Sequence, residues 1–233
     1  MNTYGITDSM TGRAGDGDQG RDGSQGPDAA QLLAHPVIAR LARTINGWPG
    51  ALAETAGPEV RRAAVALILR AGHAGALELL FIQRSEFAGD PWSGQVAFPG
   101  GRQEQVDDTL RETAIRETCE EVGVDLARDG IVLGMLDELH PRTPVLPPIV
   151  VRPYVAVVEA HAGLTLSGEV ARAFWAPLDR LCDPLSSQVA TVHVRGQAMQ
   201  VPCVRHESYV IWGMTERIFR DFQRRLASSS QTR

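Results

Sequence analysis

Three glutamates near the middle of the chain have the type and spacing to bind a cation. Glu117, Glu120 and Glu121 lie at positions i, i+3 and i+4, so on a helix their carboxylates share one face. Like charges at this spacing repel, at a cost of about 0.2–0.5 kcal/mol per exposed pair. In a cleft the repulsion grows, and Mg²⁺, which takes hard oxygen ligands, water and substrate phosphates, would relieve it. The alternative is an ordinary solvated helix face.

The surrounding residues favour the metal site. Residues 95–98 predict a short strand that is stopped by a turn at Pro99-Gly100-Gly101. The following loop is acidic and carries Glu104, Asp107 and Asp108. A helix is expected over 109–122, because Thr109 and Glu112 form a capping-box signature and Gly123 suits a C-terminal stop.

This arrangement resembles the box of the Nudix hydrolases, Gly-x5-Glu-x7-Arg-Glu-U-x-Glu-Glu-x-Gly-U, in which U is bulky and apolar. The second half is present at 116–124 as Arg-Glu-Thr-Cys-Glu-Glu-Val-Gly-Val, with Thr118 at a position that is usually bulky and apolar. The first half differs, since Asp108 occupies the Glu position and the loop from Gly101 is one residue longer. Either Asp107 or Asp108 could therefore face the metal.

Two further stretches are similar to the coenzyme A diphosphatase branch of that family. Residues 80–85 read Leu-Phe-Ile-Gln-Arg-Ser and precede Gly-Gln-Val-Ala-Phe-Pro-Gly-Gly at 94–101, while 209–215 read Tyr-Val-Ile-Trp-Gly-Met-Thr. The resemblance covers roughly residues 60–226. It implies cleavage of coenzyme A or an acyl-CoA to 4′-phosphopantetheine and 3′,5′-ADP. However, the branch usually has Leu-Arg-x-His where 89–93 read Gly-Asp-Pro-Trp-Ser, so ADP-ribose or another nucleoside diphosphate derivative is an alternative substrate.

The resemblance also implies a cofactor and its ligands. The ion is Mg²⁺, with Mn²⁺ as an alternative, and the implied ligands are Glu117, Glu120, Glu121 and the carbonyl of Gly100. Arg116 either orients Glu117 and the cluster or forms a surface pair with Glu112 or Glu120.

The general base has several candidates. Glu117 or Glu120 could serve, and members of the family also recruit a carboxylate from outside the box. Here the outside candidates are Glu138 and Glu169, and each is otherwise expected to be solvated.

Three residues outside the glutamate helix are candidates for substrate binding. Arg84 and Arg102 could contact phosphates or lie solvated on the surface. Trp92 could stack on a nucleobase or anchor a packed loop. By contrast, Trp212 and the stripe from Phe219 to Phe222 are interpreted as core.

The order of apolar segments predicts an α/β fold, and the resemblance specifies a Nudix-type α/β/α sandwich with a mixed sheet. Residues 63–69 and 77–83 predict a hairpin of buried strands. Further segments with strand or helix patterns are strands at 131–136, 150–158 and 192–204 and a terminal helix at 206–226. We expect a disordered tail at 1–30, a helical extension at 31–57 and the hydrolase domain at 58–227.

Composition narrows the class of partner. The net charge of −5 gives no basic surface for a nucleic-acid backbone, and no apolar run is long enough to span a membrane. Three widely spaced cysteines and the lack of a secretory signal predict a cytoplasmic protein. The expected partner is a small nucleotide diphosphate substrate, with a homodimer as a possible assembly. A Nudix-like module that binds a nucleotide without cleaving it is the alternative from another functional class.

Overall fold

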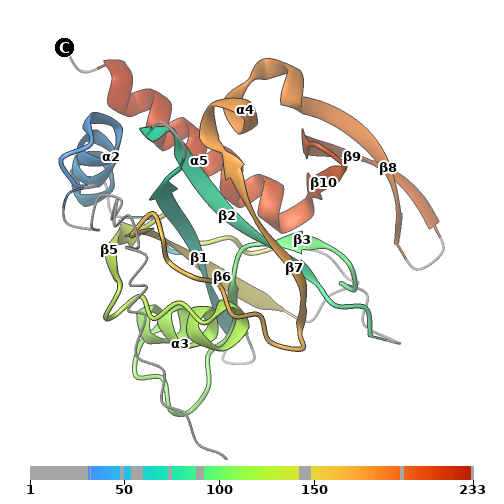
Figure 1. The fold of residues 1–233 in the computed structure, drawn as a ribbon. Helices are drawn as coiled ribbons and strands as arrows, with labels where there is room; N and C mark the ends of the chain where they lie inside the picture. Colours follow the sequence, from blue (N-terminus) through green and yellow to red (C-terminus); the bar gives the residue numbers. More distant parts are fainter. Residues whose placement is uncertain are drawn as a thin grey trace, which may run out of the picture.

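The computed structural model describes residues 31, 33–47, 50–53, 60–72, 75–87, 92–141, 148–194 and 197–231. The predicted tail at 1–30 lies outside them. In the predicted extension, α2 (Pro36–Gly47) is helical, and Ile38, Leu41 and Ile45 along one side of it are buried. This side packs in the same core as α5 (Gly213–Gln231), the last helix of the chain (Figure 1).

A seven-stranded mixed sheet forms the centre of the molecule (Figure 1). Its strands are β1 (Arg61–Ala71), β2 (Leu77–Arg84), β3 (Val96–Ala97), β4 (Gly100–Arg102), β5 (Gly130–Met135), β6 (Ile149–Val158) and β7 (Val170–Pro177). The main order is β3-β2-β1-β6-β5, and β4 and β7 pair with β1 and β2 respectively. Among the strand pairs of this sheet that the structure describes, only β1 with β6 is parallel. Both are buried on two faces, as their nearly continuous apolar sequences require.

The two faces of this sheet are covered by different helices, which confirms the predicted α/β/α layering. Leu67, Leu69 and Phe81 belong to the core on the side of α2 and α5. Their neighbours Ile68 and Leu80 point to the opposite face, where α3 (Leu110–Val122) packs (Figure 1). The alternation follows from the period of two in a strand, and each fully buried side chain of this kind contributes about 1.5–3 kcal/mol.

The strands β1 and β2 form the predicted hairpin but separate along their length. They pair only over 69–71 and 77–79. Beyond that point β3 pairs with β2, while β4 pairs with β1 at 63–65. The segment 96–102 therefore fills the fork between the two strands. The turn predicted at Gly100-Gly101 is in fact strand β4, which runs directly against β1.

The chain after β7 differs from the prediction. It forms α4 (Leu178–Cys182), the 3-10 turn η2 (Pro184–Ser186) and a three-stranded antiparallel sheet of β8 (Ser187–Val194), β9 (Gln197–His206) and β10 (Tyr209–Trp212). The single strand predicted at 192–204 is wrong, because it spans the end of β8 and most of β9. The helix predicted at 206–226 begins later, at Gly213.

The late helix start has a local cause. Val210 and Ile211 have helical spacing relative to Met214 and Ile218. In the structure they belong to β10, where they pair with Arg205 and Val204 of β9. The tight turn before them has Glu207 at a φ of 51°. β-branched residues favour such a strand, and their spacing alone does not separate the two structures. Among the described helices, none combines the length and hydropathy of a membrane span.

Candidate active site

The glutamate helix α3 begins and ends where the sequence predicts. The Thr109 hydroxyl accepts a bond from the Glu112 N–H at 3.3 Å, and the Glu112 carboxylate accepts one from the Thr109 N–H at 2.8 Å. Gly123, with a φ of 73°, ends the helix and donates to the Cys119 carbonyl. Thr118 is fully buried and donates to the Ala114 carbonyl at 2.7 Å, which satisfies its hydroxyl at a usually apolar position. Both helix ends are therefore fixed, and with them the glutamate face.

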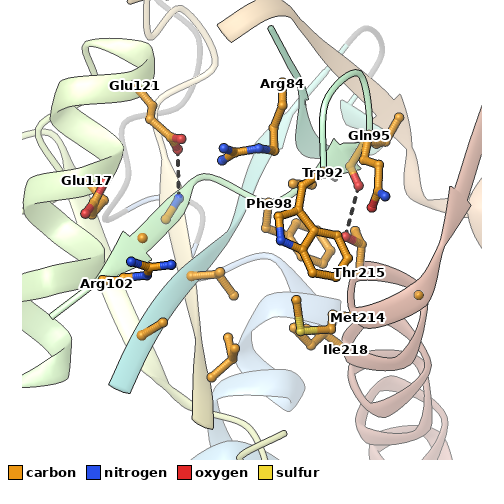
Figure 2. A pocket seen from close by; sticks show the side chains of 18 of the residues that line it. Arg84, Trp92, Gln95, Phe98, Arg102, Glu117, Glu121, Met214, Thr215 and Ile218 are labelled. Atoms are coloured by element: carbon orange, nitrogen blue, oxygen red, sulfur yellow. Dashed lines mark hydrogen bonds between the residues drawn. The ribbon is translucent and has the colours of Figure 1, made fainter. Parts of the chain in front are cut away.

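A cavity of about 440 Å³ lies in the fork of the sheet, between α3, the 92–102 segment and the first turn of α5. Glu117 and Glu121 lie at one end of it in Figure 2, and Trp92, Phe98 and Met214 at the other. Arg84 lies between these ends. Other predicted residues among its lining are Gly100, Arg102 and Glu169. The cavity thus has an acidic end and an aromatic, apolar end.

Glu121 is the most buried carboxylate of this cavity, with 5% of the residue exposed. It accepts a hydrogen bond of 2.8 Å from the Gly100 N–H. Burial raises the pKa of Glu121 to about 7, the Gly100 bond and Arg84 oppose the rise, and repulsion from Glu117 and Glu169 adds to it. The acidic end therefore disfavours two negative charges when no cation is bound.

Glu117 shares this environment. Burial raises its pKa, the neighbouring Arg116 opposes the rise, and the charges of Glu120 and Glu169 add to it. Glu169, which is distant in sequence, lines the same cavity, and its charge contributes to the raised pKa of both Glu117 and Glu121.

The two glycines of β4 allow the backbone to lie against these carboxylates. A Cβ on Gly101 would lie 2.3 Å from Glu117 Oε1. A Cβ on Gly100, which has a φ of 149°, would lie 2.2 Å from the Ala64 carbonyl oxygen in β1. Only glycine adopts this φ without strain and leaves both spaces open. The Gly-Gly pair therefore allows two close approaches, one of Gly101 to Glu117 and one of Gly100 to β1.

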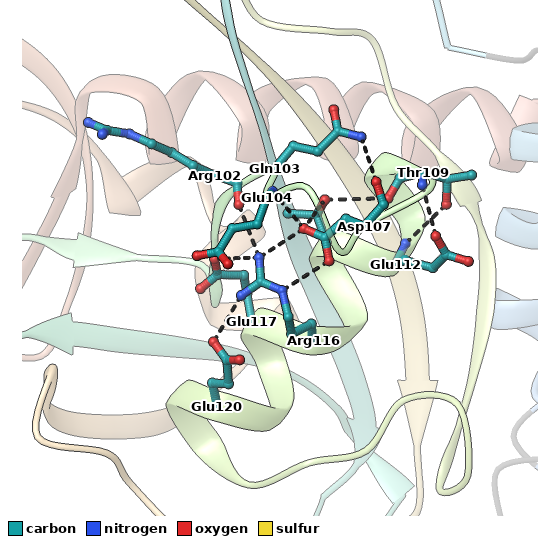
Figure 3. A network of polar contacts seen from close by, with 10 residues as sticks. Arg102, Gln103, Glu104, Asp107, Thr109, Glu112, Arg116, Glu117 and Glu120 are labelled. Carbon is teal, nitrogen blue, oxygen red and sulfur yellow. Dashed lines mark hydrogen bonds and ion pairs between the residues drawn. The ribbon is translucent and has the colours of Figure 1, made fainter.

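Arg116 lies at the centre of a polar network beside the cavity (Figure 3). Its Nε and Nη2 donate to the two oxygens of Asp107 at 3.0 and 2.9 Å. The same guanidinium donates to Glu117 at 3.0 Å, to Glu120 at 2.9 Å and to the Arg102 carbonyl at 3.1 Å. Both interpretations of Arg116 thus have a structural counterpart, because it pairs with Glu120 along the helix and also holds Glu117.

Asp107 and Asp108 have very different surroundings. Asp107 is 7% exposed and also accepts from the Thr113 hydroxyl and the Glu104 N–H. The Arg116 guanidinium lowers the pKa of Asp107 to about 2, with help from the two other donors. Asp108 is exposed. Neither lines the cavity, so Asp107 acts in this structure as an anchor for Arg116.

Glu138 is not solvated, which corrects the expectation from sequence. Its side chain is 3% exposed and forms ion pairs with Arg62 and Arg152. It also accepts a bond from the Ala53 N–H. The loop that carries it is held against β6 through the bridge of Leu139 with Val151, and Glu138 is not among the residues that line the cavity. Glu169 is exposed, as expected, and lines the cavity.

Four residues of the 209–215 motif line the cavity, namely Trp212, Gly213, Met214 and Thr215, and one of them, Trp212, was assigned to the core. Trp212 is half-buried and lines the cavity rather than the core, whereas Phe219 and Phe222 are fully buried as predicted. Thr215 was not predicted as a site residue. Its buried hydroxyl donates to the Val96 carbonyl at 3.0 Å (Figure 2) and joins the start of α5 to β3. The Trp-Gly-x-Thr run was the signal that could have identified both.

The residues present fit a hard divalent cation. Among the described residues, no three His, Cys, Asp or Glu side chains are grouped closely enough to hold a metal by themselves. Mg²⁺ requires less, since one or two carboxylates with water and substrate phosphates complete its shell. Glu117 and Glu121 supply two carboxylates in the cavity. Glu120, 59% exposed at its side chain, faces Arg116 in this structure.

Known proteins with similar sequences include hydrolases of one family. A peroxisomal coenzyme A diphosphatase, ndx-8, of Caenorhabditis elegans is 41% identical over 92 residues, which are 39% of this chain and 38% of that protein. An uncharacterized Nudix hydrolase, NudL, of Photorhabdus laumondii subsp. laumondii is 35% identical over 129 residues, or 54% of this chain and 65% of the relative. The chain thus spans less than two thirds of the length of these relatives.

Solved structures give looser matches. A MutT protein from Methanosarcina mazei Go1 is 18% identical, with 79% of this chain and 99% of that chain covered and a TM-score of 0.48. An Ap4A hydrolase binary complex from C. elegans is 25% identical, with coverages of 52% and 82% and a TM-score of 0.44. The family is established instead by the sequence model of the NUDIX domain, which matches residues 60–194, more than half of the chain. The protein therefore belongs to the Nudix family.

Proposed function

We propose that the protein is a Mg²⁺-dependent hydrolase that cleaves the diphosphate linkage of a nucleotide derivative, with Mn²⁺ as an alternative ion. The observation that carries this proposal is the cavity itself. Glu117 and Glu121 occupy one end of it, and Arg84 and Arg102 lie within the same cavity. Carboxylates that hold a cation and guanidinium groups that bind phosphate oxygens are two of the requirements of phosphoanhydride cleavage.

Each side chain then has a defined task. Glu117 and Glu121 would hold the ion, and Glu120, once turned away from Arg116, and the Gly100 carbonyl would be further ligands. The ion would neutralise phosphate charge and make a water more acidic. Arg84 and Arg102 orient the diphosphate. Arg116 acts as a positioning residue, because it links Glu117 to Asp107.

Glu169 is the favoured general base among the carboxylates outside the box. It lines the cavity and influences both Glu117 and Glu121, whereas Glu138 is held in buried ion pairs. An exposed carboxylate at the cavity can accept a proton from the attacking water and release it to solvent. Glu117 and Glu120 remain the alternatives.

Coenzyme A or an acyl-CoA is the first choice of substrate, because a relative that is named a coenzyme A diphosphatase shares 41% identity over part of the chain. Trp92 lines the aromatic end of the cavity, where it can stack on a nucleobase. Its place in the 89–93 run that differs from the coenzyme A branch makes ADP-ribose or another nucleoside diphosphate derivative the second choice. A module that binds a nucleotide without turnover is the third candidate function. The three intact glutamates make it less favoured than a hydrolase.

The decisive experiment measures product release from coenzyme A, dephospho-CoA, ADP-ribose, NADH and nucleoside triphosphates, with and without Mg²⁺ or Mn²⁺. We expect metal-dependent release of 3′,5′-ADP from coenzyme A in the wild type and none in Glu117→Gln. Turnover of ADP-ribose alone would keep the mechanism and change the substrate. Binding without turnover across the whole panel would establish the binding module instead. Cytoplasmic location, the absence of nucleic-acid and membrane partners and a homodimer remain predictions.

A further inference from the structure

A second cavity adjoins the first at its aromatic end. It has a volume of about 340 Å³ and lies between the 92–96 segment and the three-stranded sheet of β8, β9 and β10. The two cavities share Gln95, Val96 and Trp212 in their lining. Figure 2 places Gln95 beside Trp92, far from Glu117 and Glu121. A substrate bound through its diphosphate at the acidic end would thus approach the second cavity with its distal part.

The second cavity differs from the first in its chemistry. The first carries three glutamates and two arginines, whereas no Asp, Glu, Lys or Arg occurs among the described residues that line the second. Its polar side chains carry hydroxyl, amide and imidazole groups: Gln83, Ser93, Gln95, His193, Ser208 and Tyr209. Such groups match hydroxyls and amides and offer no fixed cation for a further phosphate.

The walls of this cavity are held in place by the fold. The Tyr209 ring stacks on Phe174 with centroids 3.9 Å apart. The Gln83 side chain donates to the Gly94 carbonyl at 3.2 Å, and Ser93 Oγ contacts the backbone of Phe87 at 2.9 Å. A site whose walls are ordered before binding loses less entropy when a ligand enters.

We propose that the second cavity is a subsite for an uncharged, hydrogen-bonding arm attached to the diphosphate of the substrate. This inference rests on the proposed function and extends it to the distal part of the substrate. Two sources supply such an arm, a chain of amides, as in dephospho-CoA, or a sugar, as in ADP-ribose. The β-methyl ester of ADP has the same diphosphate and base and lacks either arm.

Two variants that fill the cavity from two elements of the three-stranded sheet, the strand β8 and the turn before β10, test the subsite. His193 is exposed on β8 and Ser208 is exposed in the turn before β10, so His193→Trp and Ser208→Trp each narrow the space. Val189→Trp is the matched control, because Val189 lies on the same strand, is 65% exposed and does not line the cavity. Circular dichroism melting curves verify that all three variants fold.

The kinetic readout compares substrates with and without an arm. We expect both filling variants to raise the KM for the arm-bearing substrate about tenfold, or about 1.4 kcal/mol, while the KM for β-methyl ADP and all values for Val189→Trp stay unchanged. The substrate affected, dephospho-CoA or ADP-ribose, identifies the arm. An equal change for β-methyl ADP, or no change for either arm-bearing substrate, would overturn the subsite.

A binding measurement separates failure of the subsite from failure of the proposed function. If the wild type cleaves none of these compounds, the proposed hydrolase is wrong, and titration calorimetry with the α,β-methylene analogue of ADP-ribose and with dephospho-CoA decides the subsite. Weaker binding of either compound to both filling variants than to Val189→Trp would still support it. Equal binding of both compounds to all three variants would rule it out.

Discussion

At the scale of single residues, the three glutamates of α3 stand in unequal positions although they share one helix face. Glu121 is buried against the Gly100 N–H, and Glu117 is held by Arg116 within the cavity. Glu120 is mostly exposed and pairs with Arg116 outside it. A role for Glu120 in metal binding therefore requires its side chain to turn away from Arg116, which an exposed pair of this kind allows.

Replacement of Glu120 tests that rotation. We expect Glu120→Gln to lower Mg²⁺-dependent turnover by about 10–100-fold or more, by analogy with the loss of groups at metal sites. The stability should fall by no more than about 0.5 kcal/mol, because the pair with Arg116 is exposed. Metal-dependent rates and urea unfolding of the same preparation measure the two effects. An unchanged rate would remove Glu120 from the metal site.

The two neighbouring aspartates provide a matched comparison. Asp107→Asn keeps the shape but weakens the bonds to Arg116 and Thr113, so we expect a loss of about 1–3 kcal/mol in unfolding free energy and a lower turnover. Asp108→Asn alters an exposed side chain and should change the free energy by less than about 0.5 kcal/mol. Urea denaturation measures both. A larger loss of activity in Asp108→Asn than in Asp107→Asn would indicate that Asp108 faces the metal.

At the scale of elements, the site depends on the fork between β1 and β2. Because these strands pair over only three residues each, β4 can enter beside β1 and present Gly100 and Gly101 to α3. The first turn of α5 closes the other side through the bond from Thr215 to Val96. The acidic helix, the glycine strand and the last helix thus meet only because the sheet opens at this point.

The two glycines of β4 should respond differently to alanine. Gly101→Ala places a Cβ against the flexible end of Glu117, so we expect reduced turnover with a nearly normal melting temperature. Gly100→Ala meets the backbone of Ala64 and Val65 and adopts an unfavourable φ, so we expect destabilisation by about 1–3 kcal/mol. Thermal melts and initial rates separate the cases. Equal destabilisation by both changes would contradict this division of roles.

At the scale of the whole molecule, the stability of the fold depends on pH in the acid range through Asp107. The carboxylate of this residue joins the acidic loop to α3. Its folded-state pKa of about 2 lies below the ordinary value of 3.8. The folded protein therefore holds this proton less tightly than the unfolded chain, and the carboxylate stabilises the fold above pH 3.8. That contribution is lost as the pH falls from about 4 towards 2.

The pH dependence can be measured as a difference. We expect the unfolding free energy of the wild type to exceed that of Asp107→Asn by a constant amount above about pH 5. The difference should shrink as the pH is lowered towards 2. Urea unfolding at a series of pH values gives both curves, and the subtraction removes the other titrating groups. A difference that does not vary between pH 5 and 2.5 would show that Asp107 is not ion-paired in the folded protein.

The sequence by itself determined the features that depend on residues close together in the chain. The limits of α3 follow from Thr109, Glu112 and Gly123, because caps act within one turn of the helix. The common face of the glutamates follows from the helical repeat. The same local logic predicted the β1–β2 hairpin, the buried strand β6 and, through the resemblance, the family.

The tertiary structure decided everything that joins distant segments. Arg84, Glu169 and Trp212 come from three separate parts of the chain and meet at one cavity, whereas Glu138, with an equally plausible sequence context, is drawn into ion pairs with Arg62 and Arg152. Asp107 rather than Asp108 faces Arg116 because the loop folds back on α3. Periodicity reports which residues are buried, but burial alone does not say which surfaces meet. That depends on strand pairing and helix packing over the whole chain.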